Sequence, residues 1–275
     1  MKIELHSHTH YSRGMAIYYD GVCSPEEMVR AASDSGLDAI AITDHDTMEA
    51  VKEAQQAGKK YGIMVIPGEE VSSSDGHILG LNISETIKPG LSAEETIDEI
   101  HSQGGTSIAP HPFDIKKTGI RELCTKTDAI ESFNALNLDK LSNRKAFYFA
   151  KQNKLRTVAS SDAHHWKMVG HGITETDADG IDNALINIKK GRTKLHTKSM
   201  PLRNITELAI RRLQMSYPYI SDYLNSNYSY PKRMLATSML KMVNHSPGPM
   251  DKVFNAMTYV SFGAVVMYSV LSSLK

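Results

Sequence analysis

Cysteine is scarce in this sequence of 275 residues, which contains only Cys23 and Cys124. Two such residues make neither a disulfide framework nor a Cys-x-x-Cys pair, so we expect reduced thiols in a cytoplasmic protein. A Gly-x-Ser-x-Gly elbow and a P-loop are also lacking, which leaves no support for a serine hydrolase or a nucleoside triphosphatase. Because residues 1–5 already read as a strand, we expect no signal peptide.

The formal net charge of zero hides an uneven distribution. Residues 1–188 carry 18 Lys and Arg against 28 Asp and Glu, whereas residues 189–275 carry 13 against 3. An acidic body suited to attracting cations is therefore joined to a basic tail suited to an anionic surface. We expect the two parts to have different roles.

Short apolar strands alternate with amphipathic helices between residues 2 and 191. Ser24 and Ser92 precede acidic first turns, as N-cap residues do, and glycines follow several predicted helices. Repeated strand and helix units of this spacing predict an α/β fold with a parallel sheet. The predicted strands are 2–6, 38–43, 64–67, 106–110, 129–133 and 157–160, and the predicted helices are 25–35, 47–61, 93–103, 138–152 and 181–190.

Imidazole and carboxylate side chains follow these strands in short polar segments. Residues from many strands meet at the C-terminal mouth of a closed β/α barrel, whereas an open sheet gathers them less easily. We therefore predict a barrel, incomplete or distorted because only six or seven strands can be counted. Mixed nitrogen and oxygen ligands suit Zn, Mn or Fe, and their number predicts two or three ions. The side chains concerned are His6, His8, His45, one of Glu69 and Glu70, His77, His111, Asp162 and His164.

Two segments predict how individual side chains face the metals. In His6-Ser7-His8 both imidazoles lie on one face, because strand side chains alternate with a period of two. In residues 42–47 we predict His45 as a ligand, Asp44 as the residue that orients it, and Asp46 as the cap of a helix starting at Thr47.

Two further segments leave more open. Glu69 and Glu70 point to opposite faces, so only one of them reaches the metals, and the period alone does not decide which. His77 follows Asp75-Gly76 and is predicted on the return arm of a hairpin. His111 lies between two prolines that fix its backbone.

Taken in order, these motifs resemble the polymerase and histidinol phosphatase (PHP) family of metal-dependent phosphoesterases. The resemblance covers His6 to about Gly191. It rests on His-x-His, Thr-Asp-His-Asp, Gly-x-Glu, the histidine of the Gly-His hairpin, Ala-x-His-Pro and Ser-Asp-Ala-His. It implies a distorted, seven-stranded TIM-like (β/α) barrel with two or three Mn, Zn or Fe ions at its mouth. It also implies that Glu70, rather than Glu69, is the bridging ligand.

The sequence departs from the family pattern at one ligand. The small nucleotide phosphatases of the family usually have Asp-Gly a few residues after His-x-His. Here Asp20-Gly21 follows a longer segment that contains Tyr18 and Tyr19. We align Asp20 with the metal-binding aspartate and expect the inserted segment to form a wall of the substrate pocket.

The predicted mechanism is attack of a metal-bound hydroxide on phosphorus, with the metals neutralising the developing charge. Cationic side chains on mouth-side loops should complete a phosphate clamp, and Arg13, Lys116 and Lys117 are the candidates. Glu131 and Asn134, after the fifth strand, are predicted to contact substrate. The predicted substrates are phosphate esters of nucleotides or short oligonucleotides. A histidinol-phosphate phosphatase, or a non-enzymatic scaffold that docks through its tail on nucleic acid or membrane, are the alternatives.

Three segments follow from these patterns: the barrel at 1–191, a basic and tyrosine-rich helical extension at 192–250, and an apolar C-terminal helix at 251–275. The uncharged run 253–274 is just long enough to span a bilayer, although it contains several polar residues. One interpretation is a C-terminal membrane anchor behind a basic stretch. The other, which we favour, is a helix packed on the barrel or on a second subunit.

Overall fold

The computed structural model describes residues 1–14 and 17–273, so the last two residues of the predicted apolar segment lie outside the described part of the chain. Its centre is one sheet with the strand order β7-β6-β5-β4-β3-β2-β1-β8-β9. The strands are β1 (Lys2–Glu4), β2 (Ala39–Ile42), β3 (Met64–Ser73), β4 (Gly76–Leu81), β5 (Thr106–Ala109), β6 (Ala129–Asn134), β7 (Thr157–Ser160), β8 (Gly172–Glu175) and β9 (Lys194–Thr197).

The sheet is distorted because it is not parallel throughout. Strands β1, β2 and β3 run parallel to one another, as do β5, β6 and β7, but β4 runs antiparallel to both of its neighbours. His77 lies on β4, the return arm of a hairpin opposite Ser72, as the sequence predicts. Strands β8 and β9, which the sequence pattern does not reveal, add an antiparallel pair beside β1.

The sheet curves into a nearly closed barrel, and closure depends on side chains and single bridges. The Thr174 hydroxyl accepts from the amide of Ala159 (3.0 Å) and donates to its carbonyl (2.9 Å), which joins β8 to β7. Beyond the strand ends, the amide of His8 donates to the Ala163 carbonyl at 2.8 Å, and the amide of Ala163 donates to the His6 carbonyl at 3.1 Å. The predicted distorted barrel is confirmed.

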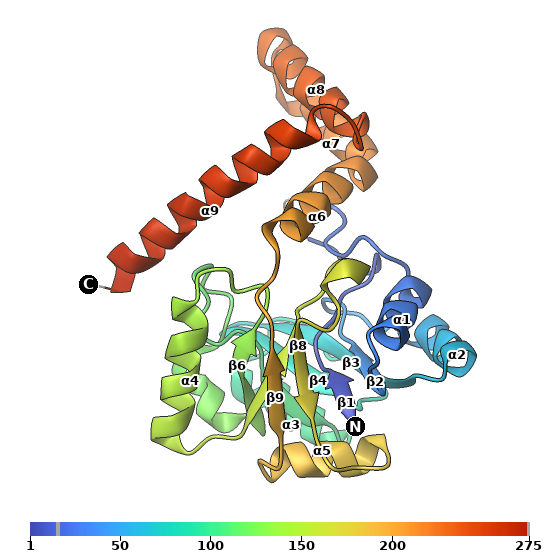
Figure 1. The fold of residues 1–275 in the computed structure, drawn as a ribbon, viewed down its shortest axis with the longest axis vertical. Helices are drawn as coiled ribbons and strands as arrows, with labels where there is room; N and C mark the ends of the chain where they lie inside the picture. Colours follow the sequence, from blue (N-terminus) through green and yellow to red (C-terminus); the bar gives the residue numbers. More distant parts are fainter. Residues whose placement is uncertain (15–16, 274–275) are drawn as a thin grey trace.

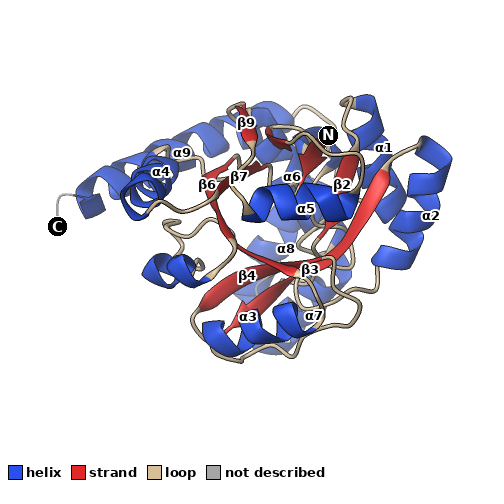
Figure 2. Ribbon diagram, turned by 90° about the horizontal axis from the view of Figure 1, so that it is seen from below, coloured by secondary structure: helices blue, strands red, loops and turns tan. Residues whose placement is uncertain are grey.

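Helices surround the barrel on its outside (Figures 1 and 2). Capping boxes start α1 at Ser24 and α3 at Ser92, as predicted. Helix α5 crosses the end of the barrel opposite the C-terminal helices, where Leu185 and Ile188 pack against the inner core with Ile3 and Leu79. The helices are α1 (Pro25–Asp34), α2 (Val51–Tyr61), α3 (Ala93–Ser102), α4 (Leu141–Asn153) and α5 (Ile181–Lys189), with 3-10 turns η1 (Arg121–Lys126) and η2 (Trp166–Met168).

One predicted helix start is wrong. Helix α2 begins at Val51 rather than Thr47, and Asp46 does not cap it. Instead Asp46 adopts a left-handed φ of 52° and its carboxylate accepts from the amide of Ser72 at 2.7 Å. The side chain thus ties the loop after β2 to β3, because a short Asp tolerates this backbone and can bond nearby amides.

The sheet continues past residue 191 to β9, and the described residues after it form four helices above the barrel mouth (Figure 1). Helix α6 is fixed to the barrel by the Lys167 ammonium, which lies 2.6 and 2.7 Å from the two oxygens of the Glu207 carboxylate. The helices are α6 (Leu202–Met215), α7 (Tyr217–Asn227), α8 (Tyr230–Asn244) and α9 (Asp251–Ser273).

Helix α9 contacts the rest of the molecule mainly near its two ends. The hydroxyls of Thr206 and Thr258 are hydrogen bonded at 2.8 Å, and Ser269 donates to the Asp139 carboxylate at 3.0 Å. Between these contacts most of the helix is exposed to solvent, and Val260 is 75% exposed. By length and composition Asp251–Leu271 qualifies as a membrane span, the one such helix in the described residues. Packing on the barrel is therefore partial, and membrane contact stays a prediction.

Candidate metal centre

All nine side chains predicted as metal ligands meet at the mouth of the barrel. They form four overlapping groups in which one nitrogen or oxygen atom of each residue lies within 4.8 Å of those of the others. The groups are His8, Asp20, His45 and His164; His6, His8 and Glu70; His6, His111 and Asp162; and His45, Glu70 and His77. The overlap fits a cluster of sites with shared ligands.

His6 and His8 point inward from the end of β1, and both are fully buried. Their Nε2 atoms are 2.9 Å apart, and each lies 3.1 Å from the same Glu70 oxygen. Two imidazole nitrogens and a carboxylate oxygen directed at one point form a chelating set of the kind that binds Zn, Mn or Fe. The two imidazoles thus lie on one face, as the alternation of side chains along a strand predicts.

Glu70 lies at the centre of the cluster. One carboxylate oxygen faces His6 and His8, while the other lies 2.9 Å from His77 Nδ1 and 3.0 Å from His111 Nε2. Burial opposes ionisation of Glu70, but the surrounding imidazoles outweigh it and hold its pKa well below the ordinary value. An ionised carboxylate with its two oxygens facing different imidazole pairs has the position of a bridging ligand.

Glu69 points away from the cluster, as alternation along β3 requires. It is fully buried and accepts from the amide of Ile87 at 2.5 Å, and burial raises its pKa to about 7. The geometry thus agrees with the Gly-x-Glu motif, which favours Glu70 over its neighbour.

The donor set fits divalent cations. Burial lowers the pKa of His45 to about 3, so this imidazole is neutral and its lone pair is free for a ligand. In the described part of the chain, the buried Nδ1 atoms of His45 and His111 have no hydrogen-bond partner. His111 and Asp162 also have left-handed φ values of 29° and 53°. Buried ring nitrogens without a hydrogen-bond partner and residues with strained backbone concentrate at functional sites.

Asp20 reaches the cluster despite the inserted segment before it. Its carboxylate lies 2.6 Å from His164 Nε2 and 2.6 Å from the Arg212 guanidinium, whose Nε also donates to the Asp20 carbonyl at 2.5 Å. Gly21 is needed next, because a Cβ there would overlap the carbonyl of Thr9. Burial opposes ionisation of Asp20, but His164 and Arg212 outweigh it and keep its pKa well below the ordinary value.

Family models and known relatives match the part of the sequence that carries this metal centre. A model described as PHP domain matches residues 4–96, and one described as PHP-associated matches residues 140–193. An uncharacterized protein of Methanocaldococcus jannaschii is 39% identical over 150 residues, which span 52% of this chain and 87% of that protein. The chain belongs to the PHP family.

Other matches are a sequence relative that shares a shorter segment and two solved structures of lower identity. A 5'-3' exoribonuclease of Haemophilus influenzae is 40% identical over 89 residues, or 31% of this chain and 30% of that enzyme. Among solved structures, PsfC from Pseudomonas syringae has a TM-score of 0.57 at 18% identity, covering 78% of this chain and 98% of that one. An amidohydrolase from Chromobacterium violaceum has a TM-score of 0.51 at 19% identity, covering 68% and 96%. These two structures establish the shared fold.

Glu131 and Asn134 are hydrogen bonded to the metal-ligand residues of this PHP protein. Glu131 is buried, lies 2.9 Å from His6 Nδ1 and accepts from the amide of His111 at 2.8 Å. The Asn134 amide donates to Glu131 at 2.8 Å and to Asp162 at 3.1 Å. Neither side chain lines the pocket above the cluster, so the predicted contact with substrate is revised: both hold ligands in position.

Asp44 also has a different partner from the one predicted. It accepts from the amide (2.5 Å) and hydroxyl (2.7 Å) of Thr9, and it has no hydrogen bond to His45 in the described residues. The backbone of His45 is instead fixed by Ser12, whose hydroxyl accepts from the His45 amide at 3.1 Å and lies 3.1 Å from His8 Nδ1. Asp44 thus fixes the turn after His8, and Ser12 was missed by sequence reasoning.

The three predicted cations lie in three different places. Lys116 lines the pocket of about 290 Å³ above the cluster. Lys117 lines an adjoining hollow instead. Arg13 is exposed and packs over Tyr18 and Tyr19, 4.8 and 4.7 Å from the ring centroids, and donates to the His10 carbonyl. We therefore no longer expect Arg13 to clamp a phosphate.

The cation that sequence reasoning missed is Arg212. It lines the metal pocket from α6, and Val265 of α9 lines it as well. Of the described residues of the inserted segment, only Asp20 lines this pocket, so the segment does not form the predicted wall. Tyr18 instead stacks on Tyr219 of α7, with 3.8 Å between the ring centroids. The extension and the insertion thus pack together and place Asp20.

Proposed function

We propose that this PHP protein is a metal-dependent phosphoesterase that hydrolyses phosphate esters of nucleotides or short oligonucleotides. The observation that carries the proposal is the ring of nine imidazole and carboxylate donors around the barrel mouth, with Glu70 between two pairs of imidazoles. Ligand groups that share members in this way suit two or three ions, and a polynuclear site suits phosphoryl chemistry.

The chain's own residues prepare the site for a phosphate. Divalent ions, when bound, would lower the pKa of a coordinated water and neutralise charge on phosphate oxygens. Glu131 orients His6 and His111, and Arg212 holds Asp20. Lys116 lies at the pocket wall where it can approach a bound phosphate, and Arg212 adds a second positive charge there.

The substrate class is inferred from relatives and from the pocket. The exoribonuclease of Haemophilus influenzae and a DNA polymerase III PolC-type of Oceanobacillus iheyensis match parts of this chain, the latter at 42% identity over 74 residues. The chain covers 30% and 5% of their lengths, so a nucleotide substrate is a proposal. We find no feature in the described pocket that selects an imidazole-bearing substrate, which disfavours the histidinol-phosphate alternative.

Metal removal and replacement tests the proposal. Purified protein treated with a chelator should lose hydrolysis of a generic phosphate ester, and added Mn²⁺ should restore it. His8→Ala should abolish the restored activity, whereas His245→Ala, an exposed histidine after α8, serves as the matched control. Activity that resists chelation and survives His8→Ala would refute the proposal. Protein without stoichiometric transition metal, and without activity after Mn²⁺ addition, would instead support a scaffold.

A further inference from the structure

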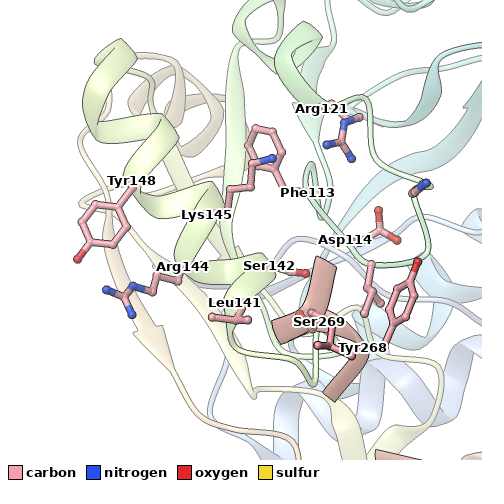
Figure 3. A pocket seen from close by; sticks show the side chains of 13 residues that line it. Phe113, Asp114, Arg121, Leu141, Ser142, Arg144, Lys145, Tyr148, Tyr268 and Ser269 are labelled. Carbon is pink, nitrogen blue, oxygen red and sulfur yellow. The ribbon is translucent and has the colours of Figure 1, made fainter. Parts of the chain in front are cut away.

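A second hollow, whose lining side chains are drawn in Figure 3, adjoins the metal pocket. It has a volume of about 960 Å³ and lies between the η1 region, the start of α4 and the end of α9. Asp114 and Ile115 line both hollows. Helix α9 also borders both, through Val265 on the metal pocket and Tyr268 on the second hollow. The two hollows therefore share part of their lining, and we call them together the cleft.

The wall of this hollow is strongly basic. Four cations line it: Lys117, Arg121, Arg144 and Lys145. Among the described residues their one ion pair is between Arg121 and Glu122, at 3.9 Å and with both side chains about half exposed, which makes it weak. This concentration of positive charge is unusual for the body of the chain, because residues 1–188 are acidic as a whole.

The single acidic residue of the wall is already engaged. The Asp114 carboxylate accepts from the amides of Thr118 and Gly119, each at 2.9 Å, and from the Thr118 hydroxyl at 3.0 Å. These bonds shape the loop that carries Lys117 but leave the carboxylate charged, so the wall sets four positive charges against one negative charge. The net field in the hollow remains positive, which favours an anionic ligand.

Aromatic rings are interleaved with these cations. The Lys145 ammonium lies 4.5 Å from the centroid of Phe113, and the Arg144 guanidinium lies 5.6 Å from that of Tyr148. Tyr268 of α9 borders the same space (Figure 3). Phe113 is buried, so the rings on which a base can stack are those of Tyr148 and Tyr268, which are 49% and 57% exposed. Cations that track a phosphate backbone, together with exposed aromatic rings, are the combination that proteins use to bind single-stranded nucleic acid.

We propose that this hollow is a second anion site, which holds a phosphate group of the substrate beyond the one at the metals. This rests on the proposed phosphoesterase function and narrows its substrate: the cleft selects single-stranded oligonucleotides over mononucleotides. A mononucleotide reaches only the metal pocket, whereas a longer strand also places a phosphate among Lys117, Arg121, Arg144 and Lys145 and a base against an aromatic ring.

Binding without hydrolysis is the first test. A fluorescently labelled five-nucleotide single strand is titrated with the full-length protein in the presence of a chelator, at several salt concentrations. Arg144→Ala combined with Lys145→Ala should weaken binding about tenfold and reduce the salt-dependence slope by about 0.7 for each cation removed. The matched control is Lys52→Ala with Lys59→Ala, two exposed cations of α2 that should leave both quantities unchanged. Equal losses in both double variants, or no loss in the first, would overturn the proposal.

Substrate preference is the second test. With Mn²⁺ present, the ratio of kcat/KM for the five-nucleotide strand to that for a mononucleotide should fall about tenfold in the Arg144 and Lys145 double variant. An unchanged ratio contradicts the second site even if hydrolysis proceeds. If the protein hydrolyses no phosphate ester, the proposed function fails while the binding test still decides the anion site, so the two failures are distinguishable.

Discussion

Replacing Arg212 by Ala should weaken metal binding, because this one side chain of the extension holds Asp20. The guanidinium makes two contacts of 2.5 and 2.6 Å to Asp20, and about a fifth of each side chain is exposed. Charge-assisted hydrogen bonds of this kind contribute about 1.5–3 kcal/mol, and partial exposure lowers the sum toward about 1–3 kcal/mol. That range corresponds to a loss of metal affinity of about 10- to 100-fold, as found for residues that orient metal ligands.

Calorimetric titration of metal-free protein with Mn²⁺ measures this loss. Arg211→Ala is the matched control, since the neighbouring arginine is exposed and has no contact with Asp20 in the described residues. Arg212→Lys should fall between the wild type and Arg212→Ala, because a lysine keeps the charge but not the planar fork. If Arg212→Ala binds Mn²⁺ as tightly and with the same stoichiometry as Arg211→Ala, the extension does not support the metal centre.

Two further predictions concern regions away from the metals. Burial opposes ionisation of the partly buried Asp128, but the Ser107 amide, His101 and Lys189 outweigh it and lower the pKa of this carboxyl. Because the pKa in the folded state lies below the unfolded value near 3.8, the ionised carboxylate stabilises the fold above that pH. This stabilisation is lost as the pH falls below 3.8 toward the folded pKa. Urea unfolding of Asp128→Asn should therefore show a deficit of about 1 kcal/mol at pH 7 that shrinks toward pH 3, and a deficit independent of pH would contradict the ionic origin. Helix α9 should bind vesicles that contain anionic lipid, and flotation with Val260→Asp and neutral vesicles as controls measures this; protein that stays unbound at low salt would end the membrane prediction.

The barrel and the nine side chains of the metal cluster could be predicted because they follow local rules. Several ligands stand just after a strand, so knowing the strands suffices to bring His6, His45, His111 and Asp162 to one mouth. Asp20 follows no such rule, and its place was predicted from the family resemblance. Strands β8 and β9 escaped because neither is a run of apolar residues: their sequences are GITE and KLHT. β8 pairs with β1 and β9 pairs with β8, both antiparallel, and no local pattern in the sequence indicates either pairing.

The supporting residues could not be predicted because their partners are distant in the chain. Glu131 lies near the end of the fifth predicted strand, and only its burial beside His6 distinguishes a supporting residue from a substrate contact. Arg212 lies 192 residues from Asp20, in a segment whose sequence pattern is irregular. No local period connects two such residues, so their contact is a property of the tertiary structure alone.

The contact between Arg212 and Asp20 changes how the extension is understood. A separate docking module would leave the barrel complete without it, yet α6 supplies the cation that holds a predicted ligand, and α9 borders both hollows of the cleft. The inserted segment before Asp20 packs on α7 through Tyr18 and Tyr219. An insertion that moves a ligand away from its usual spacing needs a new support, and the extension provides it. The basic tail is therefore part of the site's architecture, whichever surface its exposed helices contact.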